Sequence, residues 1–141
     1  MRAYDATSLV EATPDQVWPV LTDAGAWPDW DSGVTGVVGR VAVGEKISIS
    51  VETNPGRAFP VRATTLDAPH RMVFSGGMPL GLFTGERTYT LSAEGSGTRF
   101  TMREEYSGPL APMIFRSIPD LGPSFRQFVT GLKQRVESPP A

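Results

Sequence analysis

Two residues of opposite charge stand in neighbouring strand-like segments, where their spacing could bring them into contact. The segment "GTRFTMREEYSG" (97–108) alternates like a half-buried strand. Its inward row is otherwise apolar or aromatic but contains a glutamate: Phe100, Met102, Glu104 and Tyr106. The preceding segment "GERTYTLSA" (85–93) alternates in the same way and places Arg87 in the row of Tyr89 and Leu91. A carboxylate and a guanidinium on one inward face suggest either an ion pair or the polar anchor of a ligand site.

The loop "EGSG" between these segments predicts how they pair. It places Ala93 opposite Thr98, so Arg87 falls opposite Glu104. Directly opposed residues of an antiparallel pair have Cβ atoms about 4.5–5.5 Å apart. A two-residue slip would keep the same faces but would put Met102 opposite Leu91. We therefore expect an Arg87–Glu104 pair on the inward face, with the register as the point to test.

This pair has two interpretations. In the first it is a structural ion pair at the open end of the sheet, where it fixes the hairpin register. In the second it lines a cavity and, with the hydroxyls of Tyr89 and Tyr106, presents polar groups to a ligand among apolar walls. If the site were catalytic, Glu104 would be the general acid or base of an aldol-type cyclisation or dehydration, and Arg87 would stabilise an enolate. Contact with arginine anchors a carboxylate, which favours binding over catalysis.

The composition of the chain excludes some kinds of function and argues against others. The chain has 141 residues and no cysteine, which excludes disulfides and thiolate chemistry. The single histidine, His70, lies in the turn-like "DAPH", so we expect no metal site and no cofactor. The chain has 13 Lys and Arg against 15 Asp and Glu, which gives a net charge of −2. This charge balance argues against nucleic acid as a partner. The sequence contains neither an apolar run of membrane-span length nor a secretory signal, which predicts a cytoplasmic protein.

The N-terminal region must position the first elements. Residues 2–12 read as a strand, and "TPDQVWPVLTD" reads as a short helix with Thr13 as N-cap and Gln16 completing a capping box. Pro19 should limit or bend this helix. A second helical turn is expected near Pro28 and should end before Gly33.

The rest of the chain reads as six more strands and a closing helix. The expected strands are 34–43, 45–52, 58–66, 71–76, 85–93 and 97–108. An apolar stripe at i, i+3, i+4, i+7 and i+11 predicts a long amphipathic helix from about 120 to 137: Phe125, Phe128, Val129, Leu132 and Val136. We therefore predict a single α+β domain, residues 1–141, with a curved seven-stranded antiparallel sheet wrapped around the C-terminal helix. Two short helices follow its first strand.

Three aromatic residues outside the hairpin are further candidates for the site. Trp30 follows the second helical turn and is either core or cavity wall. Phe83 lies in the Gly/Pro-rich apolar loop "SGGMPLGLFTG" (75–85), which forms either a lid or a hydrophobic plug. Phe125 is inward on the last helix, as core or as cavity wall.

Four segments in order resemble one known family: "VEATPDQVWPVLTDAGAWPDW", "DAPHRMVFSGG", "GLFTGERTYTLSAEGSGTRFTMREEYSGPLAP" and "SFRQFVTGLKQRVE". They resemble the START-like (SRPBCC) superfamily, in particular its polyketide cyclase/dehydratase-like branch, over residues 1–137. The resemblance implies a helix-grip fold with a hydrophobic cavity, but no single activity. Two residues depart from the pattern: Pro19 in the first helix, and Arg87 where many relatives carry histidine.

The sequence thus predicts a carrier or sensor that binds a small hydrophobic or amphipathic molecule between sheet and C-terminal helix. The ligand contacts expected are Arg87, Tyr89, Met102, Glu104, Tyr106, Trp30, Phe83 and Phe125. The alternative is a polyketide cyclase/dehydratase-type enzyme that acts on an aromatic or polyketide-like substrate in the same cavity. A homodimer is compatible with either function.

Overall fold

The predicted number of strands and the closing helix are both confirmed. The computed structural model describes residues 2–138. Its elements run in this order: β1 (Arg2–Val10), α1 (Pro14–Thr22), the 3-10 helix η1 (Ala24–Asp29), β2 (Val34–Val38), β3 (Lys46–Val51), β4 (Ala58–Asp67), β5 (Arg71–Met78), the short turn η2 (Pro79–Gly81), β6 (Phe83–Glu94), β7 (Gly97–Ser107), α2 (Ala111–Ser117) and α3 (Gly122–Glu137). All seven strands join one antiparallel sheet in the order β1-β7-β6-β5-β4-β3-β2.

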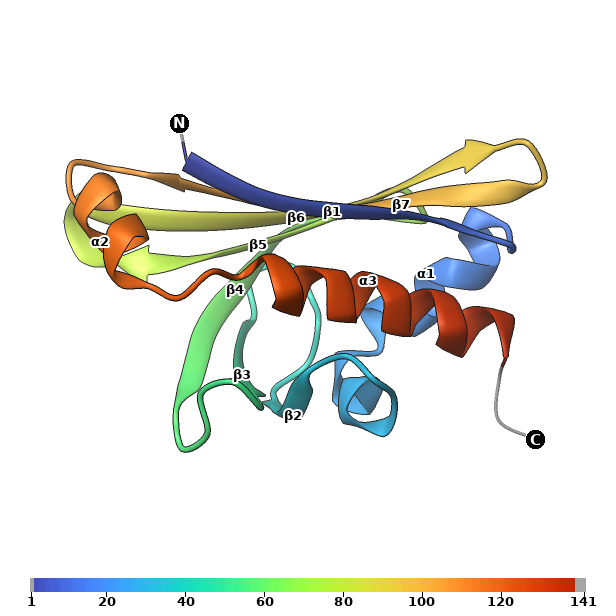
Figure 1. Cartoon of the computed structure of the whole chain (residues 1–141), viewed down its shortest axis with the longest axis horizontal. Coiled ribbons are helices and arrows are strands. Elements are labelled where there is room, and N and C mark those ends of the chain that lie inside the picture. The colour runs from blue at the N-terminus through green and yellow to red at the C-terminus, as the bar shows by residue number, and fades with distance from the viewer. Residues whose placement is uncertain (1, 139–141) are drawn as a thin grey trace.

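The sheet is curled around α3, as the helix-grip prediction requires (Figure 1). Strands β1, β6 and β7 run along one side of α3, while β2 and β3 lie on its other side. Strand β4 connects the two parts, and its register shifts between Ala63 and Thr65. Such an irregularity increases the local bend and twist of a strand. Helix α1 lies near the C-terminal end of α3, and α2 lies at the opposite end of the molecule.

The first helix forms for the local reasons that the sequence indicates. The Thr13 hydroxyl accepts from the Gln16 amide, and the Gln16 side chain accepts from the Thr13 amide, which completes the capping box. The helix continues through Pro19 to Thr22, so the proline does not end it. The helical turn expected near Pro28 begins earlier, at Ala24.

Aromatic rings fill the space between the middle of α3 and the sheet. Phe128 of α3 has its ring centroid 4.9 Å from Trp27 and 5.9 Å from Tyr89. Tyr89 in turn contacts Phe74 and stacks parallel to Phe100, at 5.5 and 6.5 Å. All five rings are buried. Burial of this much apolar surface is the main force that holds α3 against the sheet.

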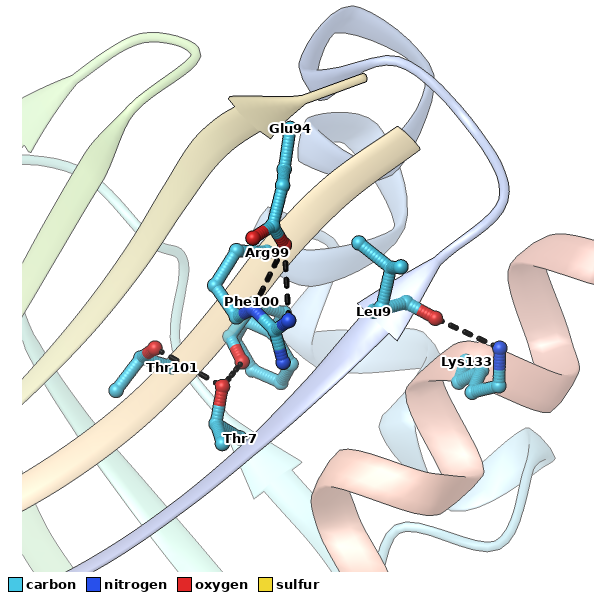
Figure 2. A network of polar contacts seen from close by, with 7 residues as sticks. All are labelled: Thr7, Leu9, Glu94, Arg99, Phe100, Thr101 and Lys133. Atoms are coloured by element: carbon cyan, nitrogen blue, oxygen red, sulfur yellow. Dashed lines mark hydrogen bonds and ion pairs between the residues drawn. The ribbon is translucent and has the colours of Figure 1, made fainter. Parts of the chain in front are cut away.

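The edge of the sheet formed by β1 is covered by the second half of α3. Lys133 donates to the carbonyl oxygen of Leu9 at 2.7 Å, as Figure 2 shows, and to Glu137 Oε2 at 2.6 Å. The Glu137 carboxylate also accepts from the backbone amide of Glu11 at 2.8 Å. The Lys133–Glu137 pair therefore satisfies backbone groups that an open sheet edge would leave exposed.

On the other side, α3 approaches the turn that follows η1. A Cβ atom on Gly131 would collide with the carbonyl group of Asp31 and would lie 3.2 Å from the Trp30 ring. Gln127, one helical turn earlier, donates to Asp31 Oδ1 at 2.8 Å and to Glu52 Oε1 at 3.0 Å. Only glycine allows α3 to lie this close to the turn.

Candidate functional site

The Arg87–Glu104 pair exists and has the predicted register. In the β6–β7 ladder Arg87 faces Glu104, and Tyr89 faces Met102, which excludes the two-residue slip. The loop between β6 and β7 is shorter than the four residues "EGSG" expected from the sequence, because Glu94 and Gly97 still pair as part of the ladder. Arg87 donates to Glu104 Oε2 from Nη2 at 2.6 Å and from Nε at 3.2 Å. The two side chains are 29% and 15% exposed, so the pair is half-buried but open to solvent.

One oxygen of Glu104 carries all of its hydrogen bonds. Besides the two from Arg87, Oε2 accepts a bond from the Tyr106 hydroxyl at 3.1 Å. Within residues 2–138 no group donates to Oε1. This oxygen lies above Gly85 of β6, where a Cβ atom would come within 3.1 Å of it. The absence of a side chain at Gly85 therefore keeps one carboxylate oxygen unobstructed.

The guanidinium of Arg87 has two neighbours of different kinds. The carboxylate of Glu104 lies on one side, and the ring of Phe125 from α3 lies 4.7 Å from the guanidinium carbon, a cation–π distance. Partial burial acts to lower the pKa of Arg87, but the charge of Glu104 more than compensates, so the pKa is raised. Arg87 is thus a permanent cation held by a charge and by a ring.

The two tyrosines of this face differ in their hydroxyl partners. Tyr106 donates to Glu104, whereas the Tyr89 hydroxyl is buried beside the Arg87 guanidinium and forms no well-aligned hydrogen bond within residues 2–138. Burial raises the pKa of Tyr89, partly offset by the charge and the N–H groups of Arg87 beside it. Burial also raises the pKa of Tyr106, and the Glu104 carboxylate raises it further. A buried hydroxyl without a well-aligned hydrogen bond is costly, so the Tyr89 hydroxyl is a group to which a ligand could supply a better-aligned bond.

Aromatic side chains from five elements, β1, β6, β7, α2 and α3, surround the polar centre. Tyr4 of β1 pairs with Glu104 across the sheet. Phe115 of α2 stacks on Tyr4, with ring centroids 5.1 Å apart, and meets the edge of Tyr106 at 5.6 Å. Phe83 stacks on the Tyr106 ring at 5.7 Å. We call this group, together with Tyr89 beside Arg87, the polar–aromatic cluster: Tyr4, Phe83, Arg87, Tyr89, Glu104, Tyr106, Phe115 and Phe125.

Sequence reasoning missed three contributors to this cluster. Tyr4 falls on the inward row of its strand, but the sequence alone does not pair residue 4 with residue 104. The segment that forms α2 was not predicted as a helix, although Pro112 at its start is a typical helix-initiation signal. Gly85 falls at the overlap of the apolar loop and the strand 85–93, and nothing in the sequence places the Glu104 carboxylate over it.

Two predicted ligand contacts lie in the packed interior and not at the ion pair. Met102 is 2% exposed and opposes Tyr89 in the ladder. Trp30 packs against Phe128, with ring centroids 5.1 Å apart, near the middle of α3. As ligand contacts, both remain predictions.

A hollow lies near the C-terminal end of α3, away from the polar–aromatic cluster. Its volume is about 390 Å³, and it is lined by Glu11, Ala12, Gln16, Val20, Val136 and Glu137. Across residues 2–138, no three histidine or acidic side chains cluster closely enough to hold a metal ion. Over the same residues, no helix has both the length and the apolar character needed to cross a membrane.

Comparison with known families gives a match over almost the whole chain. The model of the family described as "Polyketide cyclase / dehydrase and lipid transport" matches residues 1–137. A search of curated proteins finds no match.

Solved structures with the same fold have little sequence in common with this chain. Protein MLL2253 from Mesorhizobium loti superposes with a TM-score of 0.76 at 16% identity, covering 99% of this chain and 100% of that one. The Aha1 dimer from Colwellia psychrerythraea gives 0.76 at 15% identity, with full coverage of both chains. The di-domain ARO/CYC BexL from the BE-7585A biosynthetic pathway gives 0.72 at 20% identity, over 99% of this chain and 48% of that one. At these identities the likeness concerns the fold.

Proposed function

The chain belongs to the polyketide cyclase/dehydrase and lipid transport family, and from this premise we propose that it binds a small hydrophobic or amphipathic molecule as a carrier or sensor. The binding site proposed is the polar–aromatic cluster at the α2 end of the sheet. The observation that carries the proposal is the arrangement of Glu104 and Tyr89 around Arg87. Within residues 2–138, Glu104 Oε1 receives no donor, and the buried Tyr89 hydroxyl beside Arg87 forms no well-aligned hydrogen bond.

The chemistry of the cluster supports binding of an amphipathic molecule. Small-molecule sites combine apolar walls with a few convergent polar groups. Here the walls are aromatic rings from β1, β6, β7, α2 and α3, and the polar groups are Arg87, Glu104 and the tyrosine hydroxyls. The exposed fractions of Arg87 and Glu104 leave the polar centre accessible to a head group.

Helix α2 is the element that must adjust when a ligand enters. It has seven residues, its start has no side-chain cap, and Ala111 is its one buried residue. Its Phe115 covers Tyr4 and Tyr106, while Met113 is 56% exposed. We expect the apolar part of the ligand to replace the contacts that Phe115 makes.

A thermal-shift screen against lipids and aromatic compounds tests the proposal. Ligand at 100 times its Kd stabilises a protein by about 2.7 kcal/mol, and a domain of this size should gain roughly 3 °C per kcal/mol. We expect hits to lose their shift in Arg87→Ala. Arg103→Ala is the matched control, because Arg103 pairs with Asp5 and Glu105 on the opposite face of the same hairpin. The proposal would be refuted by a screen without hits. It would also be refuted if the hits raised the melting temperature of Arg87→Ala as much as that of the unaltered protein.

A catalytic use of the same cluster is the second candidate. One observation favours it: Glu104 Oε1 receives no donor within the described residues. It could take up a proton beside a permanent cation that would stabilise an oxyanion. A polyketide-like or aromatic substrate would be the class to try first. The decisive measurement compares turnover by Glu104→Gln with that of the unaltered protein, and equal rates exclude an acid–base role for Glu104.

A further inference from the structure

The polar centre of the cluster has three hydrogen-bonding groups that the fold itself does not use. Glu104 Oε1 receives no donor within residues 2–138, since all three bonds to this carboxylate go to Oε2. Arg87 bonds through Nη2 and Nε, which leaves Nη1 unbonded in the same part of the chain. The Tyr89 hydroxyl is buried beside the Arg87 guanidinium and forms no well-aligned hydrogen bond within residues 2–138. The unused groups are thus a pure acceptor, a pure donor and a hydroxyl that can be either.

The charges around these groups cancel. Arg87 and Glu104 are in direct contact at 2.6 Å. The other side chains that face them are uncharged: Tyr4 from β1, Tyr89 from β6, Tyr106 from β7, Phe115 from α2 and Phe125 from α3. An added carboxylate would meet the free oxygen of Glu104, and an added ammonium group would meet Arg87. Each would also lose hydration in a half-buried site, so neither kind of ion is favoured.

Glycine at position 85 is what allows Glu104 Oε1 to take this position. Gly85 is directly opposite Tyr106 in the ladder, and the carboxylate of Glu104 lies over it. A Cβ atom there would lie 3.1 Å from Oε1 and 3.4 Å from a Tyr106 ring carbon. The backbone at Gly85 does not need the left-handed conformation that favours glycine. Glycine is therefore needed here for the space that it leaves to the Glu104 carboxylate, and not for its backbone conformation.

We infer that the ligand of this site is an uncharged molecule that presents a hydroxyl or amide donor to Glu104 Oε1, and that the site discriminates against carboxylates. The inference rests on the proposed ligand-binding function and adds the chemical class of the head group. The oxygen of the ligand accepts from Arg87 Nη1 or from Tyr89, while its proton is donated to Oε1. Gly85 is the position that determines this specificity.

Three probes of one shape separate the possibilities: 2-naphthol, 2-methoxynaphthalene and 2-naphthoate, titrated by calorimetry at pH 7. The first has an O–H donor, the second has the same ring without the donor, and the third is an anion. We expect 2-naphthol to bind about tenfold more tightly than either of the others, since a hydrogen bond to a charged group is worth at least that factor. Equal affinity for the methoxy compound, or tighter binding of the naphthoate, overturns the inference.

Gly85→Ala tests the role of the free oxygen, and Gly36→Ala is its matched control. Residue 36 is also in a strand, but nothing lies within 4 Å of the position of its Cβ. We expect Gly85→Ala to bind 2-naphthol no better than 2-methoxynaphthalene, while Gly36→Ala keeps the preference. A preference retained in Gly85→Ala shows that Oε1 is not the acceptor and overturns the inference.

Glu104→Gln gives an independent measurement if Gly85→Ala fails to fold. Removing the negative charge leaves Arg87 uncompensated, so 2-naphthoate should bind this variant more tightly than it binds the unaltered protein. No gain for the naphthoate overturns the inference. Failure of all three probes to bind also overturns it, whereas the proposed function is judged separately, by the lipid and aromatic screen.

Discussion

Replacing Gly131 by alanine is predicted to destabilise the protein, against the usual effect of this change in a helix. In an exposed helix interior, Gly→Ala stabilises by about 1 kcal/mol, because alanine loses less backbone entropy on folding. At Gly131, however, the new Cβ would meet the carbonyl group of Asp31 and the ring of Trp30. A backbone carbonyl cannot rotate away as a side chain can, so α3 or the turn after η1 must shift.

The expected size of the effect follows from three contributions. Overpacking of a tight contact costs about 1–3 kcal/mol, and the rigid backbone neighbour places Gly131→Ala near the upper value. A shift of α3 also weakens the bond from Gln127 to Asp31, a contribution of about 1 kcal/mol. Subtracting the gain in helix propensity leaves a net loss of about 3 kcal/mol in the free energy of unfolding.

Urea unfolding followed by circular dichroism measures this difference. Thr130→Ala is the control, because Thr130 is the exposed neighbour on the same helix, and it should change stability by no more than a few tenths of a kcal/mol. A Gly131→Ala protein as stable as the parent, or more stable, would show that α3 does not pack against the 30–31 turn at this distance. The reasoning on helix–sheet packing would then fail.

Three further predictions concern charge and capping. The Lys133 ammonium, followed by the Glu11 amide, lowers the pKa of Glu137, so its contribution to stability is full above the ordinary carboxyl pKa of 4.5 and is lost as pH falls through the folded value. Lys133→Met should therefore flatten the acid limb of the thermal-unfolding profile, and an unchanged limb would contradict the assignment. Burial raises the pKa of Tyr106, so its stabilising effect is full below the ordinary tyrosine pKa of 10.0 and is lost as pH rises through the folded value. Tyrosinate absorbance should appear together with alkaline unfolding, with a smaller step in Tyr106→Phe; an equal step would contradict this. Thr13→Ala should cost about 1 kcal/mol in chemical unfolding by removing the cap of α1, whereas Thr13→Ser should restore most of it.

The elements that the sequence predicts well are those whose signals lie within a few residues of one another. The capping box joins Thr13 to Gln16, three positions apart, and both predicted bonds form. The β6–β7 register follows from a short loop, because once a tight hairpin closes, every later pair is fixed in order. This is why the contact of Arg87 with Glu104, 17 residues apart, could be predicted before the structure was known.

The surroundings of that pair depend on contacts that no local pattern specifies. Tyr4 pairs with a residue 100 positions later in the chain, because the sheet places the first strand, β1, beside the last strand, β7. Helix α2 has no long apolar stripe, and it is placed by the packing of Phe115 on rings from β1 and β7. The absence of a side chain at Gly85 matters only because Glu104 lies over it.

The sequence by itself thus determined the alternation of the strands, the hairpin register and the charge pair on the inward face. Only the tertiary structure decided which oxygen of Glu104 receives no donor, which hydroxyl is buried beside Arg87 and which rings enclose them. The physical reason is the range of the interactions. Periodicity, caps and tight turns act between near neighbours, whereas side-chain packing depends on the distances between elements that are set when the whole sheet closes on α3.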